Sequence, residues 1–421
     1  MPSLRTNFKW TLAGNLVYAL CQWGMLTVLA KAGSAPIVGQ FALGLAITAP
    51  VFMFGNLQLR AVQATDVRRD YRFADYFTLR ILKTAAGFLT IVALVLLTSY
   101  DSVTRWVILL VALSKCIECV SDVIGGLLQL NERLDQVAIS LMIRGILSIF
   151  FFGVTYLFTH SLIACTAAMC MAWLAVLLGY DCRRARQVSS SSDSWFHLEW
   201  RVVRKLALLS LPLGLVMALL SLNTNIPRYL LERFCGPADL GIFASLAYLM
   251  VALNLVVNAL CQSATTRLSS LFSEGRLHEF RRLLLRLAGF GVIVVLVGVP
   301  VSLAFGRNLL ALLYRPEYGT HVSTLAILVA ASGVSSTAFF ITSGLNSARR
   351  FRAQLPIFLS STLATILGSL LLVPKYQLNG AAVALLLSAI VGLLGNLWVL
   401  RSTLRTARAL ETQVSAFSCG G

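Results

Sequence analysis

Long apolar runs divide this chain, and short basic stretches recur at every second gap between them. Most of the 35 Lys and Arg residues fall on one set of connections. The other set holds only Lys31, Arg105, Arg228, Arg233, Arg307, Arg315 and Lys375, while Lys115 lies within an apolar run. Because lysine and arginine are enriched on the cytoplasmic side of a membrane, this alternation predicts a multi-pass topology with both termini in the cytoplasm.

Each apolar run is long enough to cross a bilayer, since about twenty apolar residues in a helix span the hydrocarbon core. We predict an all-α polytopic membrane protein whose twelve transmembrane helices lie at residues 10–30, 37–58, 77–99, 103–128, 138–159, 161–180, 206–231, 240–263, 284–306, 322–345, 355–373 and 380–400. A hydrophobic content of 58 % and a charged content of 12 % exclude a soluble globular enzyme. The net charge of +18 lies along the predicted cytoplasmic rim, where it meets anionic membrane lipids rather than nucleic acid.

A polar segment after the sixth predicted helix divides the chain. It predicts an N-terminal six-helix lobe at 1–187, a cytoplasmic linker with an interfacial helix at 188–205, and a C-terminal six-helix lobe with a cytoplasmic tail at 206–421. Gly39-Gln40-Phe41-Ala42 and Gly241-Ile242-Phe243-Ala244 open corresponding helices, so the lobes look like copies. Parallel repeats are related by a pseudo-two-fold axis along the membrane normal, which is a geometry of transporters. Two lobes packed as an inert scaffold are the alternative.

One face of the predicted helix at 103–128 carries three charges. Lys115, Glu118 and Asp122 lie at positions i, i+3 and i+7, which share a helix face. Charges at this depth are costly in lipid, so the face must point into the protein or a watery cavity. Either the three form an ion cluster that only fixes packing, or Lys115 binds substrate while Glu118 and Asp122 couple transport to a proton or sodium gradient.

Further cations gather in the first lobe. Arg60 lies at the inner end of the second predicted helix, Arg80 and Lys83 lie in the third, and Arg144 lies in the fifth. Guanidinium groups match phosphate oxygens, so we predict a cationic pocket for an anionic ligand, lined by Arg60, Lys115 and Arg144. Snorkelling of Arg80, Lys83 and Arg144 to the inner head groups is the alternative.

Amide side chains provide candidate sugar contacts. Asn223 and Asn225 lie near the end of the seventh predicted helix, just before Pro227. Their amides can bond sugar hydroxyls, or they can cap and repack a helix that the proline interrupts. Gln58 and Gln63 flank Arg60, and we predict that they also face the sugar.

Three stretches carry a resemblance to a known family: VGQFALGLAITAPVFMFGNLQLRAVQATD at 38–66, NTNIPRYLLERFCGPADLGIFASLAYL at 223–249 and LNGAAVALLLSAIVG at 378–392. They resemble the Wzx-type polysaccharide flippases of the multidrug/oligosaccharidyl-lipid/polysaccharide exporter superfamily. The resemblance implies export of undecaprenyl-diphosphate-linked oligosaccharide across a bacterial inner membrane, for O-antigen, capsule or exopolysaccharide synthesis, through a V-shaped bundle. It implies no catalytic residue, cofactor or metal. It also implies substrate contacts at Arg60 and Arg228, and a polysaccharide polymerase and assembly proteins as partners.

Two other functions remain open at this point. A cation-coupled multidrug exporter of the same superfamily would favour an apolar or acidic cavity, and the basic pocket argues against it. A membrane glycosyltransferase, polymerase or ligase acting on the same lipid carrier would need sizeable outer loops, and the predicted outer connections are short.

Overall fold

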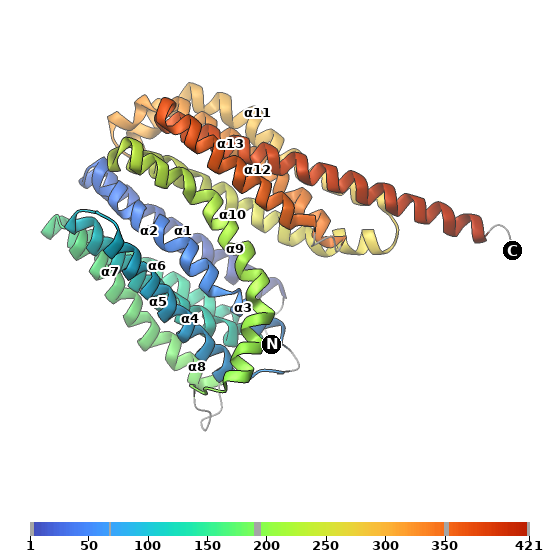
Figure 1. The fold of residues 1–421 in the computed structure, drawn as a ribbon, viewed down its shortest axis with the longest axis horizontal. Coiled ribbons are helices and arrows are strands. Elements are labelled where there is room, and N and C mark those ends of the chain that lie inside the picture. Colours follow the sequence, from blue (N-terminus) through green and yellow to red (C-terminus); the bar gives the residue numbers. More distant parts are fainter. Residues whose placement is uncertain (1–3, 67–68, 189–194, 349–352, 419–421) are drawn as a thin grey trace. The chain divides into compact units, whose positions relative to one another are not determined.

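The computed structural model describes residues 4–66, 69–188, 195–348 and 353–418, and these form helices without any strand. The first half contains α1 (Leu4–Ala32), α2 (Ala35–Asn56), α3 (Leu59–Thr65), α4 (Phe73–Leu97), α5 (Ser102–Leu130), α6 (Leu134–Thr159), α7 (Leu162–Val176), the π-helix η1 (Leu177–Asp181) and α8 (Cys182–Val188). The second half contains α9 (Trp200–Cys235), α10 (Pro237–Ser273), α11 (Leu277–Leu313), the 3-10 helix η2 (Pro316–Thr320), α12 (Val322–Ser347) and α13 (Gln354–Ser418) (Figure 1).

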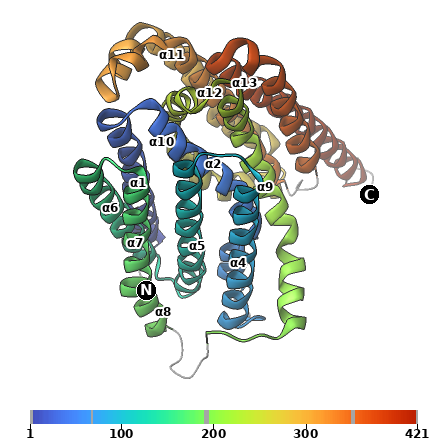
Figure 2. The same cartoon turned by 60° about the vertical axis from the view of Figure 1, so that its left-hand side comes forward.

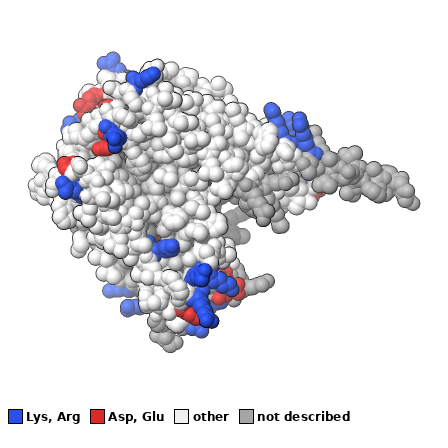
Figure 3. All heavy atoms as spheres, in the orientation of Figure 1, with Lys and Arg blue, Asp and Glu red and all other residues white. Residues whose placement is uncertain are grey.

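The membrane character predicted from hydropathy is confirmed. Within the described residues, 10 helical segments are long and apolar enough to cross a bilayer. On the visible face in Figure 3, most of the surface is uncharged. α13 runs through two predicted spans and leaves helical geometry at Gln377, where φ is 50°. α5, with 29 residues, is also long enough to cross a bilayer, but it carries the charges of Lys115, Glu118 and Asp122. The count of twelve and the two-fold symmetry remain predictions.

Two compact units make up the chain. The first unit comprises Met1–Glu232 and Gly236–Ser245, and the second unit comprises Arg233–Cys235 and Leu246–Gly421. Most of α9 and the start of α10 therefore pack with the first unit. The predicted lobes at 1–187 and 206–421 were defined from the sequence, by the polar linker and the apparent repeat, and not by packing. The boundary between them remains a prediction.

The segment before α9 differs from the predicted interfacial helix. Residues 189–194 of the predicted linker lie outside the described residues, and 195–199 are not helical. Trp195 instead packs edge-on against Phe73 and Phe77 of α4, and the His197 backbone N–H donates to Thr78 Oγ1 at 3.1 Å. These contacts hold the non-helical segment against α4 up to the start of α9.

α5 is the central helix of the first unit. It packs against α2, α3, α4, α6 and α7, and Figure 2 shows it between α4 and the α6–α7 pair. Its apolar side chains, such as Ile108 and Ala112, lie in a core shared with α2 and α4. Because neighbours surround this helix, its charged face meets protein groups, which is the condition under which membrane charges are tolerated.

α2 and α10 approach each other at two glycines of the proposed repeat. A Cβ atom on Gly39 would overlap the carbonyl oxygen of Pro237, and one on Gly241 would overlap the carbonyl oxygen of Ala35. Ala35 precedes Gly39 by the same four positions that separate Pro237 from Gly241. The contact is therefore reciprocal, as in an interface between two copies related by a two-fold axis.

Small residues hold the helices of the second unit close together. α12 packs against both α11 and α13. A Cβ atom on Gly333 would lie 2.6 Å from Val295 Cγ2 and 2.8 Å from the Gly291 carbonyl oxygen, so α11 and α12 touch almost backbone to backbone. Such small-residue contacts are a common means of helix association in membranes, where apolar surface alone gives no preference for protein over lipid.

Candidate functional site

A break in the helix at the end of the second predicted span directs the Arg60 side chain toward α5. α2 ends at Asn56, and Leu57 and Gln58 both adopt left-handed backbone angles, with φ of 49° and 51°. Such angles cost about 1–3 kcal/mol for residues other than glycine, so the surrounding packing must enforce them. α3 then restarts at Leu59 and presents Arg60 to Gly125 of α5, where a Cβ atom would lie 3.7 Å from the guanidinium carbon.

Asp122 joins three helices through one carboxylate. Its Oδ2 lies 3.0 Å from Arg80 Nη2 of α4, and its Oδ1 lies 3.5 Å from Arg60 Nη1 of α3. Arg80 is fully buried and also donates to the Asn56 carbonyl oxygen at 3.2 Å. Snorkelling is therefore wrong for Arg80. Arg60 is 31 % exposed and donates through Nε to Gln129 Oε1 at 3.1 Å.

A second pair lies one turn along α5. Lys115 Nζ is 2.6 Å from Glu118 Oε2, and the Tyr18 hydroxyl of α1 donates to Glu118 Oε1 at 3.4 Å. Lys115 also lies over the Trp173 ring at 5.8 Å from its centroid. Both charged side chains are partly exposed, at 26 % for Lys115 and 29 % for Glu118.

Arg144 forms the third pair, with Asp181 of the π-helix η1. The two side chains are 4 % and 3 % exposed, and Arg144 Nη2 lies 3.3 Å from Asp181 Oδ2. Ser140 donates to Asp181 Oδ1 at 2.6 Å, and Ser121 of α5 bonds both partners. Arg144 is thus enclosed between α5, α6 and η1 and does not snorkel. A π-helical turn inserts one extra residue, and such turns are frequent at functional sites.

These pairs surround a pocket of about 210 Å³ inside the first unit. Its wall includes Tyr18, Arg60, Glu118, Asp122, Arg144 and Asp181. The wall itself holds two cations, Arg60 and Arg144, and three carboxylates, Glu118, Asp122 and Asp181. Arg80 and Lys115 lie outside the wall and pair with Asp122 and Glu118, so the whole cluster has four cations and three carboxylates. The predicted cations are thus gathered together, but each one is already paired with an acid.

The pairs differ in how easily they can open. Breaking a buried ion pair costs about 3–5 kcal/mol, whereas an exposed pair is worth about 0–1 kcal/mol. Arg144 with Asp181 falls in the first class by its burial. Arg60, with its longer distance and larger exposure, lies nearer the second. Arg60 is therefore the cation of the pocket that an incoming anion can draw away at the lowest cost.

Several predicted site residues lie elsewhere. Gln63 is 1 % exposed, and in the amide orientation that satisfies both groups it bonds the backbone of Val123 and Leu127, so it does not face a sugar. Asn225 is 4 % exposed, donates to the Ser221 carbonyl oxygen at 2.8 Å and accepts from Arg228 at 3.1 Å. The alternative of a residue that repacks the helix near Pro227 fits Asn225 better than a sugar contact.

Other predicted contacts are accessible but do not line this pocket. Gln58, Asn223 and Arg228 are partly exposed, and none of them belongs to the pocket wall. Lys115 is not part of the pocket wall either, but it pairs with Glu118, which is.

Sequence reasoning missed Asp181, Ser121 and Tyr18. Asp181 lies one residue beyond the predicted span at 161–180, so its place beside Arg144 depends on η1 and on tertiary packing. The sequence marks Asp181 only as a single acid at the end of a predicted span, and acids at span ends are common. Within the described residues, no group of three or more His, Cys, Asp or Glu side chains is placed to hold a metal ion.

A family model and a curated relative both concern polysaccharide biosynthesis. The model of the family described as polysaccharide biosynthesis protein matches residues 4–272. The capsular polysaccharide biosynthesis protein CapF of Staphylococcus aureus is 29 % identical over 390 residues, which cover 92 % of this chain and 97 % of that protein.

Solved structures share the fold at low sequence identity. An inward-facing multidrug resistance MATE family transporter of the MOP superfamily gives a TM-score of 0.75 at 13 % identity, covering 93 % of this chain and 96 % of that one. The lipid II flippase MurJ in an inward closed conformation gives 0.72 at 12 % identity, covering 96 % and 91 %. With the fold of the MOP superfamily and a family match over more than half its length, this chain belongs to the polysaccharide biosynthesis protein family.

Proposed function

We propose that this protein is a flippase that moves undecaprenyl-diphosphate-linked oligosaccharide across the bacterial inner membrane for surface polysaccharide synthesis. Both termini lie in the cytoplasm in this proposal, and transport follows alternating access. The observation that carries it is Arg60, a partly exposed arginine held loosely at a polar pocket within a membrane-embedded helix unit. Family membership supplies the polysaccharide pathway. A polysaccharide polymerase and assembly proteins are the proposed partners.

The shared carboxylate gives Arg60 a way to change partners. A diphosphate carries more charge than one carboxylate and accepts a forked pair of N–H donors, so it competes well for a guanidinium. When Arg60 turns to the diphosphate, Asp122 keeps its shorter bond to the buried Arg80. No carboxylate is then left unpaired in the membrane, which is the usual large cost of breaking such a pair.

Lys115 and Glu118 offer a second exchange. If Lys115 turns to the substrate, Glu118 loses its 2.6 Å partner and retains the Tyr18 hydroxyl. A proton or a sodium ion then restores neutrality at Glu118, with Asp122 as a neighbouring acid. In this scheme Arg144 is a positioning residue that fixes η1 on α5. Gln58 and Asn223 remain the proposed sugar contacts, and Arg228 remains a proposed second cation for substrate.

A reconstituted transport assay tests the role of Arg60. Proteoliposomes carry a fluorescent undecaprenyl-diphosphate oligosaccharide, and a membrane-impermeant quencher reports which leaflet holds it. We expect Arg60→Ala to slow translocation by roughly tenfold to a hundredfold, because a hydrogen bond to a charged group contributes about 1.5–3 kcal/mol. Arg60→Lys retains the positive charge but lacks the forked guanidinium. Its translocation rate should therefore lie between those of the wild type and Arg60→Ala.

Lys83→Ala is the matched control, since Lys83 is a partly exposed cation of α4 outside the pocket wall. It should flip substrate at the wild-type rate. Unchanged translocation in Arg60→Ala at equal reconstituted amounts would remove Arg60 from the substrate path, and no translocation by the wild type would overturn the flippase itself.

Glu118 and Asp122 in the pocket wall also allow a cationic ligand, so multidrug export is the second candidate. Efflux of a cationic dye that depends on Glu118, from vesicles that do not flip the labelled lipid, would favour that function. Membership of the polysaccharide biosynthesis family favours the anionic lipid-linked substrate.

A further inference from the structure

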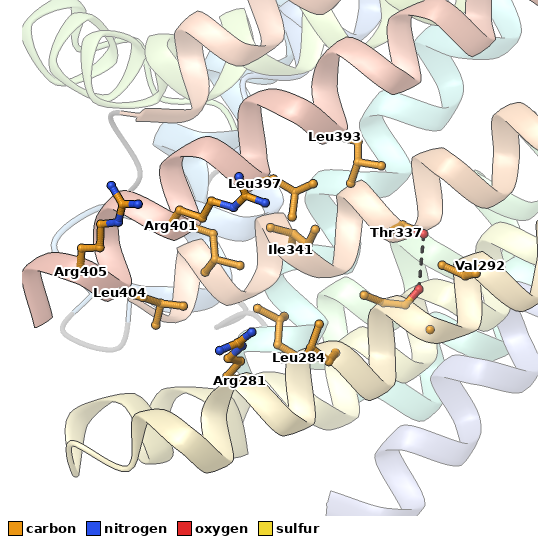
Figure 4. A pocket seen from close by; sticks show the side chains of 14 residues that line it. Arg281, Leu284, Val292, Thr337, Ile341, Leu393, Leu397, Arg401, Leu404 and Arg405 are labelled. Atoms are coloured by element: carbon orange, nitrogen blue, oxygen red, sulfur yellow. Dashed lines mark hydrogen bonds between the residues drawn. The ribbon is translucent and has the colours of Figure 1, made fainter. Parts of the chain in front are cut away.

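A groove in the second unit lies outside the site described so far. It has a volume of about 550 Å³ and is bounded by α11, α12 and α13. Its walls are two helix faces with apolar residues at helical spacing: Leu284, Leu285, Ala288 and Val292 on α11, and Leu393, Leu397, Leu400 and Leu404 on α13. Thr337 and Ile341 of α12 lie between them (Figure 4).

Three arginines lie at one end of this groove. Arg281 comes from the first turns of α11, and Arg401 and Arg405 come from α13, while Leu393 and Val292 lie toward the opposite end (Figure 4). All three are exposed. Among the residues that the structure describes, no carboxylate forms an ion pair with any of them, and the nearby Glu279 pairs with Arg276 instead.

Apolar side chains of the groove wall are exposed. Leu285 is 59 % exposed and Val292 is 47 % exposed. An acyl chain in the bilayer can therefore enter without crossing a polar barrier. The leucines alone give no preference for one lipid over another, because lipid chains are as apolar as leucine. Selectivity must come from the arginine end, where guanidinium groups match phosphate oxygens.

We propose that this groove binds one anionic phospholipid, with its phosphate at Arg281, Arg401 and Arg405 and one acyl chain along the leucines. The predicted topology places the arginine end in the cytoplasmic leaflet, and basic pockets between membrane helices on that side bind anionic head groups. A soluble phosphate would gain nothing from the apolar walls. A phospholipid reaches both parts at once and joins α11 to α13 through its chain. This site is independent of the proposed transport activity.

Native mass spectrometry of the full-length protein tests the site, after reconstitution in phosphatidylglycerol and phosphatidylcholine at equal amounts and mild detergent extraction. We expect one retained phosphatidylglycerol per chain. The triple variant Arg281→Gln, Arg401→Gln, Arg405→Gln should lower its affinity by roughly a hundredfold. The control Arg267→Gln, Arg282→Gln, Arg286→Gln removes the same charge from exposed arginines outside the groove and should retain the lipid.

A second variant, Leu397→Trp, obstructs the groove and leaves every arginine in place, so it should also release the lipid while the helical content measured by circular dichroism is unchanged. Equal retention of phosphatidylcholine, or equal loss in both triple variants, would overturn the proposal, because binding would then lack a head-group site. Displacement of phosphatidylglycerol by an equimolar polyprenyl diphosphate lipid would also overturn it and assign the groove to the substrate.

Discussion

The two units of this protein differ in the ion pairs found between their membrane helices. The first unit uses charge: Asp122, Glu118 and Asp181 each pair with a cation from the same or another helix, and α5 connects them. In the second unit, Arg276 forms ion pairs in the exposed turn between α10 and α11, outside the apolar helix cores. Its helices are joined by close glycine contacts and hydroxyl hydrogen bonds, whereas the first unit has close glycine contacts together with its ion pairs.

This difference separates groups that can change partners from groups that cannot. A carboxylate shared by two cations has several arrangements of similar energy, whereas a glycine contact has one good geometry. Polar groups inside a membrane are costly and are usually tied to function, and small-residue contacts mainly provide affinity between helices. On this reasoning the first unit holds the adaptable site and the second provides a firmer frame.

The largest expected effect is the loss of Asp181. Asp181→Ala leaves Arg144 buried without its acid and should lower the free energy of unfolding by about 3–5 kcal/mol. The measurement is a denaturant titration in detergent, followed by the reactivity of the buried free thiols Cys165 and Cys170. The double variant Arg144→Met, Asp181→Leu should unfold close to the wild type. An equally destabilised double variant would mean that shape at this position, rather than charge, matters.

In the second unit, close packing should be the sensitive feature. Gly333→Ala places a methyl group 2.6 Å from Val295 Cγ2 and should cost about 1–3 kcal/mol through overpacking. Gly153→Ala in α6 is the control, since nothing lies within 4 Å of its Cβ position. The same titration applies, with Cys261 as the buried thiol of the second unit. A neutral Gly333→Ala would show that α11 and α12 can separate freely.

Hydroxyl hydrogen bonds should matter less. Ser388 Oγ donates to the Ser361 carbonyl oxygen at 3.0 Å and connects the two parts of α13. Ser388→Ala should cost about 0.6 kcal/mol, the average for hydrogen bonds between membrane helices. Cys261 labelling during denaturation provides the measurement. A loss as large as that of Asp181→Ala would contradict the contrast between the units.

The smallest effect is expected at the exposed ion pair of the second unit. Hydrogen bonds that Arg276 donates to Glu279, and then to Glu274, raise the pKa of Arg276, but the side chains of Arg276 and Glu279 are 52 % and 45 % exposed. Water and salt screen such pairs. Glu279→Ala should therefore leave the unfolding midpoint unchanged within error, at both low and high salt.

Hydropathy was sufficient to predict the helical membrane architecture, because each span must satisfy its own backbone hydrogen bonds inside a bilayer. The charged face of α5 was also predictable, since Lys115, Glu118 and Asp122 follow helix periodicity. The location of the ion pairs in the first unit was predictable too, because the charges found within predicted spans lie mainly in the first lobe.

Tertiary partners were not predictable from these patterns. Nothing local marks Asp181 as the partner of Arg144, because the pairing depends on the extra residue in η1 and on the approach of α5. The left-handed angles at Leu57 and Gln58 have no sequence signal, since neither residue is glycine or asparagine. Gln63 was expected to meet a sugar and is instead buried against α5, because the break turns it away from the pocket.

The reciprocal contact of Gly39 with Pro237 and Gly241 with Ala35 restricts which substitutions α2 and α10 can accept where they cross. A side chain added at either glycine meets the backbone of the other helix, and no second substitution can make a backbone smaller. Random drift is free to change the two helices elsewhere, but at this crossing neither glycine can be replaced unless a whole helix moves.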